Sequence, residues 1–382
     1  MFVAILGLLA VGSVVWVGVP AYRNRVAIRE IERLGGRIIS LKSGPDWLRV
    51  WLGDDRMKMF DLVIELDFED GGVATDDALA QIAAFGELRR LDIADAPNAP
   101  ITEVGIARAG SLKNLETLYL RDTALTDAGL AALPEMPQLK SLYLAKTPVT
   151  DAGLAHLSRH SSLEVLELDS SFSDRGLEHV AQLRNLKTLT IRNRSLTDDG
   201  LVRLASLMRL QVLHVSAKQI TAVTTERLAT LPDLREIWLG GATDAALAPL
   251  SKYPSLTSLS LAGPDVTDLG IADLSGMSGL KSLSLGGTGA TDGALAHLSG
   301  LTNLNDLDLF GGQFSDAGMQ HLKQLKNLRS LRLSGIDVTD AGMVPLKELK
   351  SLKSLYLSGT KVTDAATDEL KRLRVGLTVL KR

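Results

Sequence analysis

The chain has 382 residues and carries 42 lysines and arginines against 45 aspartates and glutamates, a formal net charge of −3. It is too long to bury a single compact core, and its charge balance gives no reason to expect nucleic acid or an acidic substrate as a partner. The absence of cysteine excludes disulfides, thiolate catalysis, cysteine-based metal sites and lipid attachment through cysteine.

The N-terminal segment is apolar. Residues 2–19, FVAILGLLAVGSVVWVGV, contain no charge and would span roughly 27 Å as a helix, close to the thickness of a bilayer's hydrocarbon core. Pro20 is expected to end this helix. No basic residue precedes the segment and no A-x-A site follows it, so an uncleaved anchor over residues 1–20 is favoured over a cleaved signal peptide.

The arginines that follow the apolar segment bear on topology. They are Arg23, Arg25, Arg29, Arg33 and Arg37. Because basic residues flank membrane helices on the cytoplasmic side, we expect a single-pass membrane protein whose remaining chain lies on that side rather than outside the cytoplasm.

Residues 21–60 are predicted to connect the anchor to the next domain. AIREIERLGG is typical of an amphipathic helix that stops at a Gly-Gly pair, RIISLKS alternates like a strand, and PDWLRVWLGD places Pro45 at a helix start. We favour a cap that covers the exposed end of the following domain. The alternative places Trp47 and Trp51 in the lipid headgroup layer.

From residue 61 onward the pattern Leu-x-x-Leu-x-Leu recurs. Its central residues are Leu66, Leu91, Leu118, Leu142, Leu166, Leu189, Leu213, Ile237, Leu259, Leu283, Leu307, Leu331, Leu355 and Leu380. Eight of the 13 intervals are 24 residues long. A fixed period of this length indicates a solenoid, in which each unit buries its apolar face against its neighbours.

The repeated phrase is longer than its leucines. SLYLAKTPVTDAGLAHL at 141–157 returns as SLYLSGTKVTDAATDEL at 354–370. With this core and period, residues 61–382 resemble the leucine-rich repeat family, with about 13–14 repeats. The TDAGL phrase is similar to that of bacterial members and of the cysteine-containing class, although this chain has no cysteine. The resemblance implies an α/β solenoid with a curved parallel sheet, short helices on its convex side and a role in protein recognition. Here the solenoid would be preceded by one transmembrane helix.

The Thr-Asp pair in each repeat is interpreted as structural. Thr150 is predicted to cap a short helix through its hydroxyl, and Asp151 to place a negative charge at the positive end of the helix dipole. Eleven of the 13 segments between strands carry Thr-Asp or Ser-Asp, whereas an active site occurs once. Gly153 and its equivalents lie inside the helix at a cost of about 1 kcal/mol, so we expect neighbouring repeats to approach too closely there for a side chain.

Signals of catalysis or of a cofactor are weak. Gly287-Thr288-Gly289 imitates a phosphate-binding loop, but the third glycine of G-x-G-x-x-G is missing. Four histidines occupy equivalent helix positions in adjacent repeats, and no carboxylate recurs beside them at ligand spacing: His156, His179, His297 and His321. We therefore expect no enzyme, no cofactor and no metal. Basic residues that accumulate towards the C-terminus are read as a solvated end rather than a nucleic-acid surface.

The concave face of the predicted sheet is the expected binding surface. Thirteen strand spacings of about 4.8 Å give an arc of roughly 60 Å, which suits a protein partner and is too open for a small molecule. The residue after each central leucine should point out of the core, because side chains alternate along a strand. The interactive members of this column are Tyr119, Tyr143, Glu167, His214, Trp238, Arg332 and Tyr356. The alternative is that its aromatics pack on one another along the sheet.

Together these patterns predict a membrane-anchored scaffold that binds a protein through its concave face. Two other functions stay open: an envelope or surface adhesion protein with the repeats outside the cell, and a substrate adaptor of a ubiquitin-ligase-like complex. The adaptor is disfavoured because residues 21–60 show no leucine-proline signature of an F-box.

Overall fold

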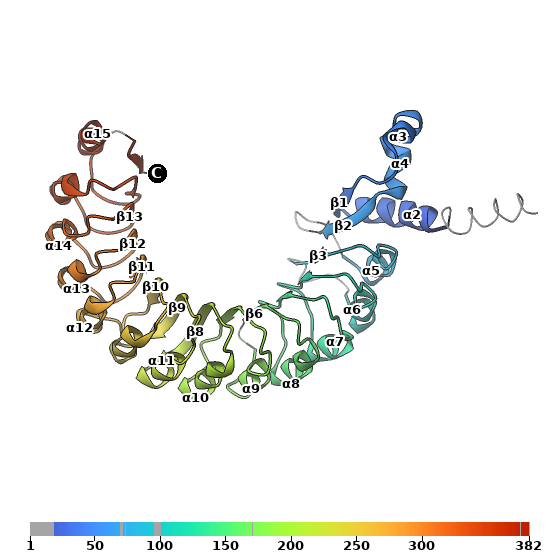
Figure 1. Cartoon of the computed structure of the whole chain (residues 1–382), viewed down its shortest axis with the longest axis horizontal. Coiled ribbons are helices and arrows are strands. Elements are labelled where there is room, and N and C mark those ends of the chain that lie inside the picture. Colours follow the sequence, from blue (N-terminus) through green and yellow to red (C-terminus); the bar gives the residue numbers. More distant parts are fainter. Residues whose placement is uncertain are drawn as a thin grey trace, which may run out of the picture. The chain divides into compact units, whose positions relative to one another are not determined.

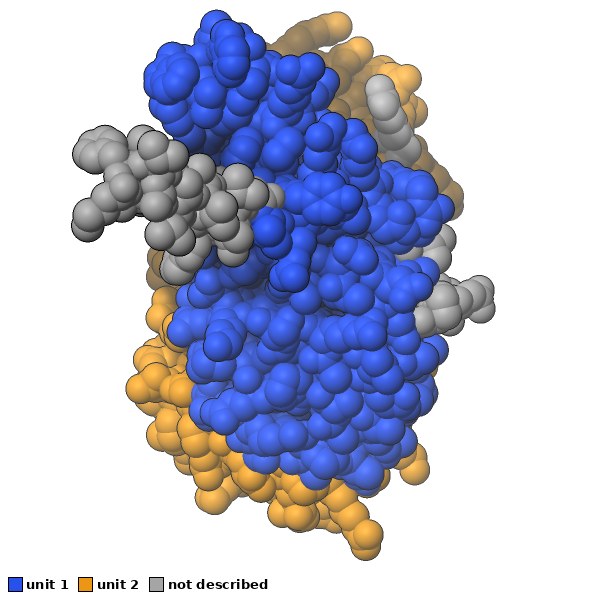
Figure 2. Space-filling view, turned by 90° about the vertical axis from the view of Figure 1, so that its right-hand side faces the viewer, with its two compact units in different colours: residues 1–172 blue, residues 173–382 orange. Residues whose placement is uncertain are grey.

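The computed structural model describes residues 19–68, 72, 74–94, 101–169, 171–374 and 376–381. The chain forms two compact units, Met1–Phe172 and Ser173–Arg382 (Figure 2). The boundaries predicted near residues 20 and 60 both fall inside the first unit.

The first described element is helix α2 (Val19–Arg33), which continues through Pro20 rather than ending there. The predicted anchor over residues 2–19 lies, except for its last residue, outside the described part of the chain. None of the helices within that described part is long and apolar enough to cross a membrane.

The region after α2 folds against the first repeat. Strand β1 (Arg37–Leu41) pairs antiparallel with β2 (Leu62–Asp67) and covers its edge. Ala27 and Ile31 of α2 are fully buried. Trp47 and Trp51 take no part in this covering, because their side chains are largely exposed on helix α3 (Asp46–Leu52).

In the first unit, short helices lie on one side of parallel strands (Figure 1). Strands β2 to β6 pair in parallel and in chain order. Helix α4 (Asp54–Met57) lies between α3 and β2. The elements after β2 are α5 (Asp76–Ile82), β3 (Arg90–Asp92), α6 (Glu103–Ala109), β4 (Thr117–Tyr119), α7 (Asp127–Ala132), β5 (Ser141–Tyr143), α8 (Asp151–Leu154) and β6 (Val165–Asp169).

The second unit repeats the arrangement, and its strands β7 to β15 also pair in parallel and in chain order. Its strands are β7 (Thr188–Arg192), β8 (Val212–Ile220), β9 (Glu236–Ala242), β10 (Ser258–Ala262), β11 (Ser282–Ser284), β12 (Asp306–Asp308), β13 (Ser330–Arg332), β14 (Ser354–Tyr356) and β15 (Thr378–Leu380). Its α-helices are α9 (Gly176–Val180), α10 (Asp198–Leu201), α11 (Ala222–Leu228), α12 (Asp268–Ala272), α13 (Asp292–His297), α14 (Asp316–Leu322) and α15 (Asp364–Leu373). After β9 and β13, 3-10 turns replace the α-helix.

Leucine alternation explains the core of each repeat. In the repeat of β5, Leu142 and Leu144 point to the helix side and are 0% and 1% exposed. Leu154 and Leu157 from the following helical segment meet them and are fully buried. Truncating such a leucine would cost about 2–5 kcal/mol.

The predicted caps are present in most repeats. The Thr150 hydroxyl accepts a hydrogen bond from the backbone N–H of Ala152 at 3.3 Å, and nine other helices begin with the same kind of cap. Thr197 and Thr243 make no such bond, and Arg175 rather than Ser173 precedes α9.

The aspartate of the motif has a role that the helix dipole did not suggest. Asp127 accepts the backbone N–H of Thr150 in the next repeat at 2.7 Å and its hydroxyl at 2.5 Å. We call this pair of hydrogen bonds the carboxylate clasp. It recurs at Asp76–Thr102, Asp174–Thr197, Asp198–Thr221, Asp244–Thr267, Asp268–Thr291, Asp292–Ser315, Asp316–Thr339 and Asp340–Thr363. Each of these nine clasps ties a repeat to its successor.

The clasp also explains the helical glycines. A Cβ on Gly153 would lie 2.3 Å from Oδ1 of Asp127, and one on Gly200 would lie 2.3 Å from Oδ1 of Asp174. The predicted close approach is confirmed, and the neighbour that requires the glycine is the carboxylate of the preceding repeat. In one repeat Thr224 occupies the position of the glycine. Its side chain is accommodated there because its hydroxyl donates a further hydrogen bond to Asp198.

At two clasps the hydrogen bonds lower the pKa of the carboxylate. Backbone and hydroxyl hydrogen bonds from Thr363 lower the pKa of Asp340. Burial alone would raise the pKa of Asp198, but the hydrogen bonds from Thr221 and Thr224 outweigh it and lower that pKa.

Candidate functional site

The face of the sheet opposite the helices, called the open face below, is formed by the residue after each central leucine. Its members in the first unit differ in exposure. Tyr119 and Tyr143 are half-buried and stack with their ring centroids 4.2 Å apart and their planes 5° from parallel. For this pair the structure supports the alternative given above, in which aromatic side chains pack on one another along the sheet.

Arginines complete the tyrosine stack. The guanidinium of Arg90 lies 4.2 Å from the Tyr119 ring centroid, and that of Arg121 lies 4.5 Å from the Tyr143 centroid. Arg90 also donates to the Tyr119 hydroxyl at 2.8 Å and to Asp92 at 3.0 Å. These cation–π contacts and hydrogen bonds fix both rings in place.

Glu167 belongs to the same cluster. It is only 6% exposed and forms an ion pair with Arg121. The sequence thus predicted three side chains that the structure brings together: Tyr119, Tyr143 and Glu167. Because their polar groups already have partners within the cluster, a ligand would have to compete with those contacts.

The open face of the second unit contains the other predicted residues. His214 and Trp238 are neighbours on paired strands, and Ser260 lies on the other side of Trp238. The imidazole Nε2 of His214 lies 2.8 Å from a carboxylate oxygen of Glu236. Trp238 therefore has a paired histidine on one side and a small serine on the other.

Glycines clear a hollow beside Trp238. A Cβ on Gly240 would lie 3.0 Å from Cη2 of the indole, so a side chain there would press on the ring. Gly241, with φ +87°, follows near the end of β9, and a Cβ there would lie 2.4 Å from the carbonyl oxygen of Ala217. The resulting hollow measures about 530 Å³ and lies entirely within the second unit, lined mainly by Trp238 and by turns rich in glycine.

Charged side chains at the hollow lack partners. Arg194, Lys218 and Asp265 line it and are exposed. Within the described part of the chain none of the three forms an ion pair, in contrast to Arg121 with Glu167. Two cations and one anion without ion-pair partners therefore lie beside the indole, where a ligand could contact them.

Arg332 and Tyr356 form a third group. Arg332 donates to Asp308 at 3.2 Å, and its guanidinium lies 5.1 Å from the Tyr356 ring centroid. The serines between this group and Trp238 line a shallow hollow of about 310 Å³ with Asp306 and Asp308.

The register of the last strand differs from the prediction by one residue. Val379 pairs with Leu355, and Leu380 pairs with Tyr356. Leu380 is therefore on the open face, 46% exposed, and Lys381 lies beyond the strand. The prediction failed because the last repeat reads Leu-Thr-Val-Leu-Lys, and it treated Leu380 as the core residue.

A model of the leucine-rich repeat region matches residues 55–296, more than half of the 382 residues. The chain belongs to the leucine-rich repeat family. No curated protein matches it.

Solved structures share the leucine-rich repeat fold. An internalin from Listeria monocytogenes matches with a TM-score of 0.57 and 22% identity, over 88% of this chain and 94% of the internalin. A Leptospira interrogans leucine-rich repeat protein gives a TM-score of 0.43 at 15% identity, over 89% and 93% of the two chains. The TLR13 chain of a TLR13–ssRNA13 complex gives 0.47 at 19% identity, over 79% and 50%. At 22% identity the likeness to the internalin shows the fold alone.

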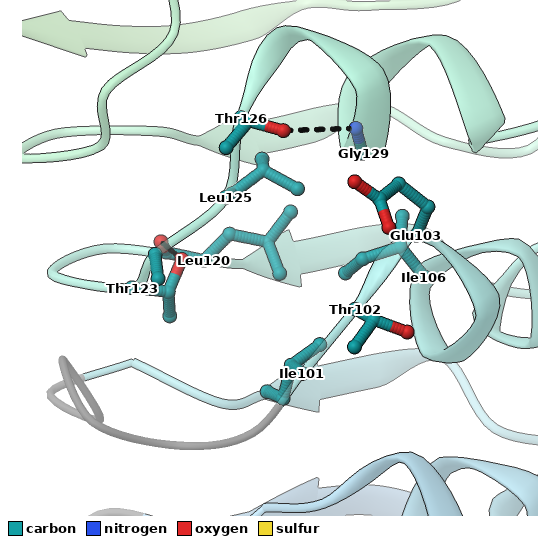
Figure 3. Close-up of a pocket in the computed structure, with 10 residues that line it drawn as sticks. Ile101, Thr102, Glu103, Ile106, Leu120, Thr123, Leu125, Thr126 and Gly129 are labelled. Atoms are coloured by element: carbon teal, nitrogen blue, oxygen red, sulfur yellow. Dashed lines mark hydrogen bonds between the residues drawn. The ribbon is translucent and has the colours of Figure 1, made fainter.

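One interface between repeats of this leucine-rich repeat chain is imperfect (Figure 3). Glu103 stands where most repeats have aspartate, and it forms no clasp with Thr126; instead, the Thr126 hydroxyl accepts from the N–H of Gly129 at 3.5 Å. A cavity of about 40 Å³ is left between the two repeats, lined by Ile106 and Leu120 among others. It has room for a water molecule and not for a ligand.

Chemistry beyond binding finds little support. In the described part of the chain no group of three or more histidine, cysteine or acidic side chains is arranged to hold a metal ion. Thr288 of the loop that imitates a phosphate site donates its hydroxyl to the carbonyl of Leu285 at 2.8 Å. Leucine-rich repeats are in general binding scaffolds rather than enzymes.

The sequence did not single out the charged residues around Trp238. Arg194 and Asp265 lie in turns after strands, and Lys218 lies near the end of β8, where the pairing is irregular. The alternation of side chains therefore gives no direction for these three residues. The one available signal was the shortened repeat from Ile237 to Leu259, 22 residues long, with its glycine pair.

Proposed function

We propose that the chain is a non-enzymatic scaffold that recognises a protein through the open face of the second unit, with Trp238 as the central contact. The single observation that carries this is the hollow of about 530 Å³ beside Trp238, bordered by unpaired charges. Tryptophan and arginine are the residue types most enriched at the energetic centres of protein interfaces.

The size of the surface fits a protein partner. Eight strand spacings from β7 to β15 give a face roughly 40 Å long. A face of this length is long enough to carry one side of a standard protein interface, which buries about 800 Å² per partner. The hollow beside Trp238 has space for one or two large side chains of the partner. The ion pairs Glu167–Arg121 and Asp308–Arg332 are assigned to packing within the chain or to the edge of the proposed interface.

A direct test uses the full chain as bait. Proteins retained by the wild-type chain are compared with those retained by Trp238→Ala and by the control Leu269→Ala, which removes an 80% exposed side chain from α12. A partner that is retained by wild type and control but lost by Trp238→Ala supports the proposal. Equal retention by all three chains contradicts it.

We also propose the membrane location, on the sequence of residues 2–19 alone. The segment would anchor the chain, with the repeats on the cytoplasmic side. Protease added to intact cells should then leave the repeats uncut, and cleavage before lysis would favour the surface adhesion alternative. The outcome of this test is independent of the contact at Trp238.

A further inference from the structure

Helix α3 exposes large apolar side chains to an unusual extent. Trp47, Val50 and Trp51 are 70%, 88% and 78% exposed, and no residue of the helix is buried. Single exposed apolar residues are ordinary on protein surfaces, but three on one short helix form a patch that calls for a covering surface.

The polar contacts of α3 point the other way. Arg49, the basic residue of the helix, has a side chain only 10% exposed. It forms an ion pair with Asp61, itself 5% exposed, and donates to Asp54 at 3.1 Å and to the carbonyl of Ser43 at 3.1 Å. The charged side chain thus holds the helix to the body of the protein, whereas Trp47, Val50 and Trp51 are exposed; Leu48 and Leu52 are half-buried.

Basic residues gather on α2 and on the segment that follows α3. After Gly53, helix α4 follows directly. A hollow of about 400 Å³ is lined by Arg25, Arg29, Arg56 and Lys58, with Glu32 and Asp55. Lys58 is near both acids, 3.9 and 3.7 Å away. The three arginines form no ion pair with any described residue and are exposed.

We propose that α3 is a membrane-contacting element, in which Trp47, Val50 and Trp51 enter the headgroup layer of an anionic bilayer while Arg25, Arg29 and Arg56 contact lipid phosphates. Tryptophan prefers the boundary between headgroups and acyl chains, and an apolar face with basic neighbours is the combination that binds anionic membranes. A protein partner would explain the apolar patch but would not require three uncompensated arginines on α2 and α4. The inference rests on neither the contact at Trp238 nor the anchor.

The test uses the full chain with Trp16→Phe and Trp238→Phe, so that Trp47 and Trp51 are the remaining tryptophans. Vesicles of phosphatidylglycerol and phosphatidylcholine are compared with vesicles of phosphatidylcholine alone, each with lipids brominated near the headgroup or deep in the acyl chain. We expect a blue shift of the emission and quenching by the shallow bromines with anionic vesicles. An anchor that inserts elsewhere in the chain would not by itself quench these two residues.

Charge-reversal variants test the role of the arginines. Arg25→Glu, Arg29→Glu and Arg56→Glu together should raise the lipid concentration for half-maximal quenching, by about fivefold for each arginine that contacts the surface. The matched control reverses three exposed basic residues of the second unit, Lys350, Lys353 and Arg372, and should behave like the parent chain. Thermal midpoints should agree for all three, because the substituted side chains are exposed.

Three results would overturn the inference. The first is an emission spectrum that vesicles of either kind leave unchanged. The second is a triple-glutamate variant that responds to lipid like its parent. The third is a blue shift that appears without vesicles as the protein concentration rises, since this would show that a second copy of the chain covers α3.

Discussion

The repeated threonine and aspartate act on different repeats. The hydroxyl of Thr150 caps its own helix, whereas the carboxylate of Asp127 binds the backbone and hydroxyl of Thr150 from the repeat before. The cap could be predicted from sequence because its partners are two residues apart. The clasp could not be predicted, because it depends on the spacing between stacked repeats. The one sign of it in the sequence was the glycine inside the helix, such as Gly153.

Coupling between a clasp and its glycine is the first prediction. Gly200→Ala places a methyl group 2.3 Å from Oδ1 of Asp174 and should lower the free energy of unfolding by about 1–3 kcal/mol. Asp174→Ala should cost about 1–3 kcal/mol, because it removes two hydrogen bonds to Thr197. The double variant should be more stable than the sum of the two losses predicts, by roughly 1 kcal/mol, in a denaturant titration.

Gly276→Ala serves as the control, because a Cβ there would meet nothing within 4 Å. It should leave the unfolding midpoint nearly unchanged. Strict additivity of Gly200→Ala and Asp174→Ala would show that the glycine serves another purpose.

His160 gives a prediction on pH. It is 1% exposed, neither ring nitrogen has a hydrogen-bond partner within the described part of the chain, and burial followed by the charge of Arg159 lowers its pKa from 6.5 to about 4. Between these values the unfolded chain binds a proton that the folded chain does not. Stability is therefore full above pH 6.5 and falls as the pH is lowered towards 4, by on the order of 3 kcal/mol.

Thermal midpoints at several pH values check this point. His160→Leu should flatten the profile between pH 4 and 6.5 relative to wild type. Parallel profiles for the two chains would mean that another group accounts for any acid sensitivity in that range.

At the scale of the strand, the direction in which a side chain points could be predicted from the sequence, but the contacts that the side chain makes could not. Alternation around Leu118 and Leu142 placed Tyr119 and Tyr143 on the open face correctly. Their stacking with each other and with Arg121 depends on rotamers of different strands, which no local pattern fixes. The same limit applies to α3, whose outward tryptophans follow from the inward ion pair of Arg49 with the distant Asp61.

The tyrosine stack should contribute to stability. Tyr143→Ala should lower the free energy of unfolding by roughly 1–2 kcal/mol, and the double cycle with Tyr119→Ala should give a coupling of about 0.5–1.5 kcal/mol. Tyr356→Ala is the comparison, since Tyr356 has an arginine near its ring but no aromatic stacked on it among the described residues. Denaturant unfolding measures all four variants, and zero coupling would show that the rings serve binding rather than packing.

At the scale of the molecule, the period of about 24 residues was enough to predict a stack of repeats with a parallel sheet. It also predicted Trp238 and His214 as neighbours on the second unit's open face. The hollow itself could not be predicted, because Arg194 lies in a turn and Lys218 in the irregular end of β8, where the alternation of side chains no longer gives their direction. In this chain the regular repeats predict the scaffold, whereas the candidate site lies where a repeat departs from the pattern.

The affinity of a captured partner for Trp238→Ala, measured by titration calorimetry beside wild type and Leu269→Ala, tests the central claim most directly. The account predicts that Trp238→Ala binds at least roughly tenfold more weakly, as expected for the centre of an interface, while Leu269→Ala binds like wild type and all three chains unfold at similar temperatures. The same affinity for all three chains would contradict it and would place the binding surface away from the Trp238 hollow.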